Sequence, residues 1–251
     1  MPAASLITAI VVSHDSAEVL PACLSALAAE GVPAIVVDNA SGDGSTTIAR
    51  ERGASVIASP RNEGYGRANN RGVTASTTPF VLIVNPDVEM RPGAVAALLE
   101  AAQRYPDAAL FAPRIVEPSG RVFLQPRSLL SPAHLNRSGA IVIPEGDACL
   151  PFLSGACLLV RREIFVALGG FDPAIFLFYE DDDLCRRLRD AGLDPMLLAQ
   201  RGAQAVLKMI VEDGLFHADP HPGNVFYLPG NRIAFIDFGM VGRLSVRRRE
   251  E

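Results

Sequence analysis

The chain has 251 residues, of which 49% are hydrophobic and 20% are charged, a composition typical of folded globular proteins. A net charge of -5 at pH 7 argues against a protein that holds nucleic acid by an overall basic surface, so any phosphate binding must be local. The length suffices for one sizeable α/β domain and a smaller piece.

The apolar opening LITAIVV predicts a buried strand, because it is too short to span a membrane and no basic start or cleavage site accompanies it. The four cysteines are far apart and fit no metal-binding spacing. They indicate reduced core residues in a cytoplasmic protein, and they are Cys23, Cys149, Cys157 and Cys185.

Short β-branched runs and helical stretches alternate over the first 110 residues. The predicted strands cover residues 6–12, 34–38, 55–59 and 79–85, and the predicted helices cover 17–31, 45–53 and 92–105. This alternation predicts an α/β fold with a mainly parallel sheet and helices on both faces. Ligands of such sheets bind at the carboxyl ends of the strands, where the polar clusters 38–41, 62–66 and 85–87 fall.

Residues 113–152 are rich in Pro, Gly and Arg without clear periodicity, which predicts a long excursion over an active site or acceptor groove. A strand follows at 154–160, then a short helix from Arg161 and the turn GGFD at 169–172. The segment FYEDDDLCRRLRDAG predicts a further helix, whose acidic start faces the positive end of the helix dipole.

Any single Asp after a strand is commonly a turn former or a helix cap. The order and neighbours of four segments change this weighing, because together they carry a family resemblance: VVDNASGDGS, NEGYGRANNRG, NPDVEM and SGACLLVRREIFVALGGFDPAIFLFYEDDDLCRRLRDAG. With them, residues 5–193 resemble the family 2 glycosyltransferases, in particular the rhamnosyltransferase-like members. The resemblance implies the GT-A nucleotide-diphospho-sugar transferase fold.

The same resemblance implies a nucleotide-sugar site. Asp38 would contact the nucleotide base, and the asparagine and glycine loop would place Asn62, Gly64 and Asn70 near the ribose and diphosphate. Asp87 would bind the diphosphate and a Mg²⁺ or Mn²⁺ ion. Because Asn85 replaces the first carboxylate of the usual pair, the sugar nucleotide itself would hold much of the metal.

The catalytic base implied by the resemblance is Asp181 of the Glu180-Asp181 pair. It would take the proton of the acceptor hydroxyl and give inversion at the anomeric carbon. Neighbouring carboxylates raise one another's proton affinity, which helps a base to hold a proton transiently. For Asp182 and Asp183 a plainer role is expected, as solvent-exposed charges at a helix start.

A second signature follows near the end of the chain. HADPHPGN places His217, Asp219 and Asn224 at the spacing of a kinase catalytic loop, and Asp237 begins the triplet DFG. The segment around them, 198–244, resembles the UbiB-type atypical kinases. In these kinases the loop that covers the nucleotide, the strand lysine and the helix glutamate would all lie upstream of this segment. The resemblance therefore implies an incomplete C-lobe-like fragment.

The two resemblances meet at residues 192–195 without a Pro, Gly or Ser linker, which predicts a glycosyltransferase domain over 1–193 and a kinase fragment over 194–251. The fragment stands where the glycosyltransferase family has a histidine that helps to bind metal and diphosphate. Neither His217 nor His221 can be placed near Asp87 from the sequence.

The first hypothesis is an inverting glycosyltransferase that uses a UDP-, dTDP- or GDP-linked sugar and a cell-envelope glycan or lipid-linked acceptor. The resemblance places it in the cytoplasm, at the inner face of the membrane by peripheral association, with no nucleic-acid partner. One alternative is a kinase-like ATP-binding protein in which the tail is the working part. Another is a chimeric fusion whose first domain binds the nucleotide sugar without turnover.

Overall fold

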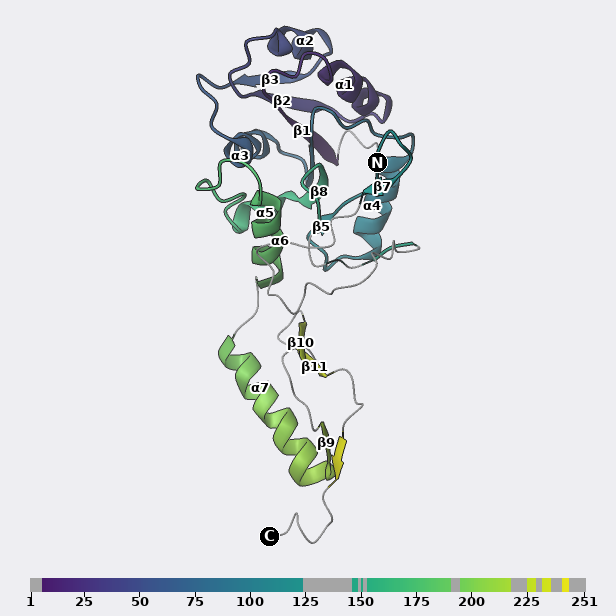
Figure 1. Cartoon of the computed structure of the whole chain (residues 1–251), viewed down its shortest axis with the longest axis vertical. Coiled ribbons are helices and arrows are strands. Elements are labelled where there is room, and N and C mark those ends of the chain that lie inside the picture. Colours follow the sequence, from purple (N-terminus) through teal and green to yellow (C-terminus); the bar gives the residue numbers. More distant parts are fainter. Residues whose placement is uncertain are drawn as a thin grey trace. The chain divides into compact units, whose positions relative to one another are not determined.

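The computed structural model describes residues 6–123, 146–148, 150, 153–190, 195–217, 225–228, 232–235 and 241–243. Contacts between Cα atoms divide the chain into two units, and the boundary between them lies after Arg189. Figure 1 shows the helices and strands of both units.

The first unit is built on a sheet of six strands in the order β3-β2-β1-β4-β8-β5. Its strands are β1 (Ile7–Ser13), β2 (Ala34–Asp38), β3 (Ser55–Ala58), β4 (Phe80–Val84), β5 (Leu110–Phe111) and β8 (Cys157–Arg161). Its helices are α1 (Leu20–Ala29), α2 (Ser45–Glu51), α3 (Tyr65–Ala75), α4 (Ala94–Arg104), α5 (Arg162–Ala167) and α6 (Glu180–Asp190). The predicted α/β architecture is confirmed.

The sheet is mainly parallel, as the alternating sequence predicts. β1 pairs in parallel with β2 and β4, and β2 with β3, whereas β8 is antiparallel to both β4 and β5. The carboxyl ends of β1 to β4 therefore lie at one edge. Since Val84 pairs with Cys157 in the antiparallel ladder, the residues that precede β8 reach the same edge.

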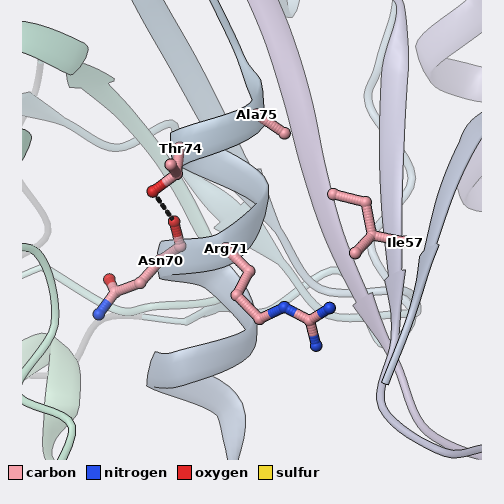
Figure 2. Close-up of a pocket in the computed structure, with 5 residues that line it drawn as sticks. All are labelled: Ile57, Asn70, Arg71, Thr74 and Ala75. Carbon is pink, nitrogen blue, oxygen red and sulfur yellow. Dashed lines mark hydrogen bonds between the residues drawn. The ribbon is translucent and has the colours of Figure 1, made fainter. Parts of the chain in front are cut away.

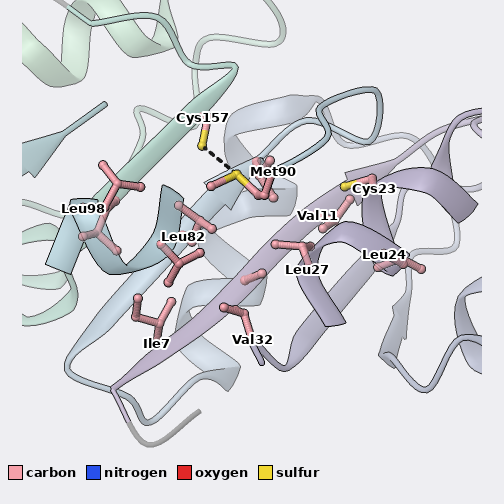
Figure 3. Packing of buried hydrophobic residues seen from close by; sticks show 14 of the residues in the cluster. Ile7, Val11, Cys23, Leu24, Leu27, Val32, Leu82, Met90, Leu98 and Cys157 are labelled. Atoms are coloured by element: carbon pink, nitrogen blue, oxygen red, sulfur yellow. Dashed lines mark hydrogen bonds between the residues drawn. The ribbon is translucent and has the colours of Figure 1, made fainter. Parts of the chain in front are cut away.

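Alternating strand residues divide between two buried layers, as they must when helices cover both faces. Ile7, Ala9 and Val11 face a cluster with α1 and α4, whereas Ile10 and Val12 face a cluster that includes α3 and Leu184 of α6. Figure 3 shows the first cluster, where the thiol of Cys157 lies 3.8 Å from the sulfur of Met90.

Three of the four cysteines, Cys23, Cys157 and Cys185, are free and buried, in agreement with the prediction of core residues. Cys149 lies outside the described residues. Of the expected excursion over 113–152, the structure describes a short antiparallel pair, β6 (Ile115–Val116) and β7 (Val122–Phe123).

The second unit contains α7 (Pro195–Leu207), which continues into a π-helical turn, η3 (Lys208–Asp213). Two antiparallel pairs come after it: β9 (Leu215–His217) with β12 (Val241–Arg243), and β10 (Val225–Leu228) with β11 (Arg232–Phe235). The predicted junction at 192–195 lies outside the described residues except for Pro195, where α7 begins. In the part of the chain that the structure describes, no helix combines the length and apolar character needed to cross a membrane.

Candidate functional site

The end of β2 presents a buried carboxylate at the carboxyl edge of the sheet. Asp38 is 4% exposed. Its Oδ2 accepts a hydrogen bond of 3.2 Å from the Ser41 N–H, while its Oδ1 is buried without a partner among the described residues. A buried acceptor without a partner is costly unless a ligand satisfies it. Asp38 can therefore accept a hydrogen bond from a bound molecule.

Asn39, which sequence reasoning did not single out, joins this loop to the start of α3. Its Nδ2 donates to Asn62 Oδ1 at 2.7 Å, and its Oδ1 accepts from the Glu63 N–H at 2.9 Å. Asn62 Oδ1 also accepts from the Gly64 N–H at 2.9 Å. The structure thus brings Asp38, Asn62 and Gly64 together through Asn39. The only signal for Asn39 in the sequence is its position at the end of a strand.

Gly64 is required by both its backbone angle and its surroundings. Its φ is +87°, and a Cβ added there would lie 2.4 Å from the carbonyl oxygen of Phe176. The next residue, Tyr65, donates its backbone N–H to the same oxygen at 2.9 Å. The turn before α3 is therefore held directly against the segment that leads to α6.

The loop after β4 carries Asp87, the residue expected to bind metal, and Asn85, which replaces the first carboxylate of the usual pair. Asn85 donates its N–H to the Ala156 oxygen at 2.9 Å, and its side-chain Oδ1 is buried without a partner among the described residues. Asp87 is exposed. Amide and carboxylate oxygens suit Mg²⁺ or Mn²⁺, but the described residues contain no group of three or more His, Cys, Asp or Glu side chains placed to hold a metal.

Asp181 lies in the first turn of α6, where two backbone N–H groups fix its carboxylate. Its Oδ2 accepts from the Gly155 N–H at 2.6 Å, and its Oδ1 accepts from the Asp182 N–H at 2.9 Å. Gly155 precedes Ala156, the partner of Asn85. Asp181 is thereby held at the same edge of the sheet as the loop after β4, although the two segments are far apart in the chain.

The other carboxylates of this turn correct one expectation. Asp182 and Asp183 are at the start of a helix as expected, but they are only 4% and 7% exposed and not solvated charges. Asp183 pairs with Arg187 at 2.6 Å and with Arg186 at 3.2 Å. The salt bridges to Arg186 and Arg187 compensate the cost of burying the Asp183 carboxylate. The sequence-based expectation did not include these salt bridges.

Glu180 is buried, with 7% exposure, and its Oε2 has no hydrogen-bond partner among the described residues. Burial, followed by the charges of Asp181 and Asp182, raises the pKa of this carboxyl above its usual range. The main cause at Glu180 is therefore burial, and the neighbouring carboxylates, on which the sequence-based expectation relied, contribute less.

Tyr65 is a second residue that sequence reasoning missed. Its hydroxyl donates to the Gly155 oxygen at 3.0 Å, so it contacts the residue whose N–H holds Asp181. Burial, reinforced by the charges of Glu180 and Asp181, raises the pKa of the phenol and keeps it protonated as a donor. The signal available in the sequence was its position between two glycines in EGYG.

Asn70 lies within α3 and not on the predicted loop. Its Nδ2 donates to the Phe171 oxygen at 2.8 Å, and its Oδ1 accepts from the Phe171 N–H at 2.9 Å. Figure 2 shows its side chain leaving α3 away from Ile57, beside a hollow of about 360 Å³ lined by Ile57, Asn70, Arg71, Thr74 and Ala75. None of the predicted carboxylates lines this hollow, and both polar atoms of the Asn70 side chain hold the GGFD turn.

The kinase-like residues are mostly beyond what the structure describes. His217 ends β9, and its backbone pairs with Val241. Asp219, Asn224 and Asp237 lie outside the described residues, as does His221.

Two family models match the chain. Residues 8–169 match the model described as Glycosyl transferase family 2, and residues 182–251 match the ABC1 atypical kinase-like domain. Neither match includes the stretch 170–181, which carries Glu180 and Asp181.

A curated relative from Mycobacterium tuberculosis, N-acetylglucosaminyl-diphospho-decaprenol L-rhamnosyltransferase, is 34% identical over 203 residues, which cover 68% of this chain. The chain spans 65% of that relative's length. The Arabidopsis thaliana protein ACTIVITY OF BC1 COMPLEX KINASE 1, chloroplastic, is 44% identical over 63 residues, 25% of this chain and 9% of the relative. The second match is therefore to a fragment.

Solved structures agree on the fold. S. aureus TarS 1-349 has a TM-score of 0.55 at 17% identity, covering 73% of this chain and 55% of that one. Mannosyltransferase PcManGT from Pyrobaculum calidifontis, solved in complex with GDP-Man and Mn²⁺, has a TM-score of 0.53 at 17% identity, covering 71% of this chain and 50% of that one. The first unit has the GT-A fold of these transferases.

Proposed function

The chain belongs to glycosyl transferase family 2, and we propose that it moves a sugar from a nucleotide sugar to a cell-envelope glycan or lipid-linked acceptor with inversion. The observation that carries this proposal is the anchoring of Asp181 to Gly155, beside the loop of Asn85 and Asp87. A fixed carboxylate and a diphosphate-binding loop at one edge are the two parts that the reaction needs.

The donor occupies the carboxyl edge of the sheet in this proposal. The free oxygen of Asp38 accepts a hydrogen bond from the nucleotide base, and the turn of Asn62 and Gly64 approaches the ribose and diphosphate. The UDP-, dTDP- and GDP-linked sugars are all candidates. Asn70, whose side chain is engaged with Phe171, positions the GGFD turn in this account and does not touch the donor.

Asp87 and the side-chain oxygen of Asn85 would hold Mg²⁺ or Mn²⁺ together with the donor diphosphate. When bound, the cation stabilises the negative charge that develops on the leaving diphosphate. Because the protein offers few anionic ligands here, the donor itself supplies the rest. Metal affinity should therefore be low without nucleotide and rise with it.

Asp181 takes the proton from the acceptor hydroxyl as that oxygen attacks the anomeric carbon. The new glycosidic bond forms on the face opposite to the departing nucleoside diphosphate, which leaves with the bonding electron pair. The two backbone N–H groups fix the carboxylate orientation before the acceptor arrives, so that little reorganisation is needed during the reaction.

Packing supports the assignment of Asp181 to the transferase and not to the kinase-like segment. Leu184 of α6 is fully buried in the cluster that joins residues of the sheet and α3 to Phe165 and Phe171. Arg187 donates to the backbone oxygens of Leu168 and Gly170 at 3.2 and 2.8 Å. The helix is thus bound to the transferase unit, although the kinase-like match begins at residue 182.

Thermal unfolding tests donor binding, because a ligand that binds only the folded state raises the midpoint. We expect a rise with one of UDP, dTDP or GDP in the presence of Mn²⁺, and none with ATP and Mg²⁺. A rise with ATP and Mg²⁺ alone would contradict the proposal and favour the kinase-like alternative. A rise with the nucleoside diphosphate but no transfer would support the impaired-fusion alternative.

Asp181→Asn tests the base. We expect sugar transfer to fall by about 10²- to 10⁴-fold, the usual contribution of a general base, while the nucleoside diphosphate still raises the unfolding midpoint. Asp172→Asn is the matched control, since its Oδ1 caps the nearby turn by accepting from the Ala174 N–H at 2.8 Å. Retained transfer in Asp181→Asn would remove this residue from the mechanism.

A further inference from the structure

We propose that residues 175–179, the apolar loop, dock on the surface of a lipid bilayer and hold Asp181 close to the membrane. The segment IFLFY leads directly into the first turn of α6, and Asp181 follows it by two residues. The link to Asp181 rests on the proposed function, whereas the membrane contact itself can be measured without any transfer activity.

The apolar loop exposes four large side chains in succession. Phe176, Leu177, Phe178 and Tyr179 are 58%, 50%, 71% and 44% exposed. The other exposed large hydrophobic residues of the described part of the first unit are single and scattered, as on most protein surfaces. A contiguous group of this kind indicates a surface that is covered in use.

The backbone holds the loop in this outward arrangement. The Phe176 oxygen accepts from the Tyr65 N–H at 2.9 Å, and the Tyr179 oxygen accepts from the Asp183 N–H at 2.9 Å. Between these bonds, Phe178 and Tyr179 have φ of +67° and +70°, a region that bulky side chains rarely adopt. Displaying these rings lowers the stability of the fold, and such strain is concentrated at functional segments.

The chemistry of the loop matches the headgroup region of a bilayer. Phenylalanine and leucine enter the acyl boundary, and a tyrosine hydroxyl remains among the polar groups. Arg67 is exposed beside the loop, and its Nε donates to the Pro173 oxygen at 2.7 Å. Its guanidinium is complementary to lipid phosphates.

The net charge of -5 means that attraction of the whole chain to anionic lipid cannot drive this contact. Insertion of the apolar side chains must supply most of the affinity. Binding should therefore persist at high salt, where attraction between exposed charges is screened.

The geometry also suits a lipid-linked acceptor. In such a molecule a diphosphate joins the sugar to the lipid, so the reacting hydroxyl stays near the headgroups. A base that serves this hydroxyl must approach the bilayer, and the apolar loop next to Asp181 allows that approach. The acceptor in the name of the Mycobacterium tuberculosis relative, N-acetylglucosaminyl-diphospho-decaprenol, has this form.

The test is co-sedimentation of the full chain, at low and high salt, with vesicles of phosphatidylcholine alone, with added phosphatidylglycerol, or with an added polyprenyl phosphate. We expect binding to all three, and a severalfold loss in Phe176→Ser/Phe178→Ser. The matched controls, Phe123→Ser and Val166→Ser, remove side chains that are 39% and 52% exposed elsewhere on the unit and should bind as the wild type does. Arg67→Gln should weaken binding to the vesicles that contain phosphatidylglycerol and leave binding to phosphatidylcholine alone unchanged.

A fluorescence measurement covers the case in which the double variant fails to fold. The chain has no tryptophan, so Leu177→Trp gives a single reporter in the loop and Val166→Trp a single reporter outside it. Vesicles should shift the emission of the first to shorter wavelength and leave the second unchanged.

Absence of vesicle binding by the wild type would overturn the proposal, as would equal binding by the double variant or equal emission shifts in the two tryptophan variants. Binding only to vesicles that contain a polyprenyl phosphate would also overturn it, because the loop would then hold the acceptor lipid and not the bilayer. If vesicle binding fails while a nucleoside diphosphate still raises the unfolding midpoint, the membrane proposal fails and the proposed function stands.

Discussion

Tyr65 joins three segments of the candidate site. Its N–H bonds Phe176 in the apolar loop, its carbonyl accepts from Asn69 within α3, and its hydroxyl bonds the carbonyl of Gly155. Since the Gly155 N–H holds the Asp181 carboxylate, the phenol is linked through Gly155 to the carboxylate that we propose as the base. We regard Tyr65 as a positioning residue.

Removing this hydroxyl should affect catalysis more than donor binding. For Tyr65→Phe we expect a lower kcat, unchanged nucleotide affinity, and a stability loss of about 1 kcal/mol from one hydrogen bond. Steady-state kinetics and urea unfolding provide the measurements. Tyr105→Phe is the control, because its hydroxyl makes an exposed bond of 3.2 Å to Asp147. An unchanged kcat in Tyr65→Phe would exclude the positioning role.

Glu180 gives a pH-dependent prediction. An acid whose pKa is raised by folding favours the folded state at low pH, and that contribution is lost as pH rises from the unfolded value, near 4.5, through the folded pKa. Glu180→Gln should therefore raise the unfolding midpoint relative to the wild type at pH 7.5. The difference should shrink toward zero at pH 4, and a difference independent of pH would show that the charge of Glu180 is not the cause.

At the scale of elements, α6 depends on the transferase sheet for its place. Leu184 is fully buried against residues of both the sheet and the preceding turn. Leu184→Ala should lower the free energy of unfolding by about 2 to 5 kcal/mol, the usual cost of a buried Leu to Ala change. Val166→Ala, at a half-exposed site on α5, should change it little. Equal urea midpoints for wild type and Leu184→Ala would contradict this packing.

The regular strands were predictable because their apolar runs and the intervening helical stretches repeat in order. The start of α3 was not, because Gly, Asn and Tyr in EGYGRANN are typical of loops. Tertiary contacts, among them those to Phe171 and Phe176, stabilise the helix there. The burial of Asp183 was missed for a similar reason. Its partner, Arg187, is visible one turn later in the sequence, but the packing of α6 that buries the pair is not.

For the site as a whole, the sequence alone could place Asp38, Asn62, Asp87 and Asp181 at element ends. It could not supply the connections among them, which run through Asn39, Tyr65 and Gly155 and depend on contacts far apart in the chain. Their roles in donor binding and catalysis remain predictions that the variants above test.

At the scale of the whole molecule, the hydrogen bonds described for the candidate site are all made by residues before α7. A chain ended after Leu193 should therefore fold and keep the rise in unfolding midpoint with the nucleoside diphosphate that the full chain binds. The shift should be of similar size in both chains. Its loss in the shortened chain, with folding retained, would show that the kinase-like segment completes the donor site.

The buried thiols of the first unit can report how often this unit unfolds locally. Burial raises the pKa of both Cys23 and Cys157 to about 12, so neither thiol forms the reactive thiolate at neutral pH while the sheet is closed. Cys23 lies on α1 and Cys157 begins β8, near the carboxyl edge that the donor would occupy. Their rates of alkylation by a thiol reagent would report how often this edge unfolds, and a bound donor should slow both rates together.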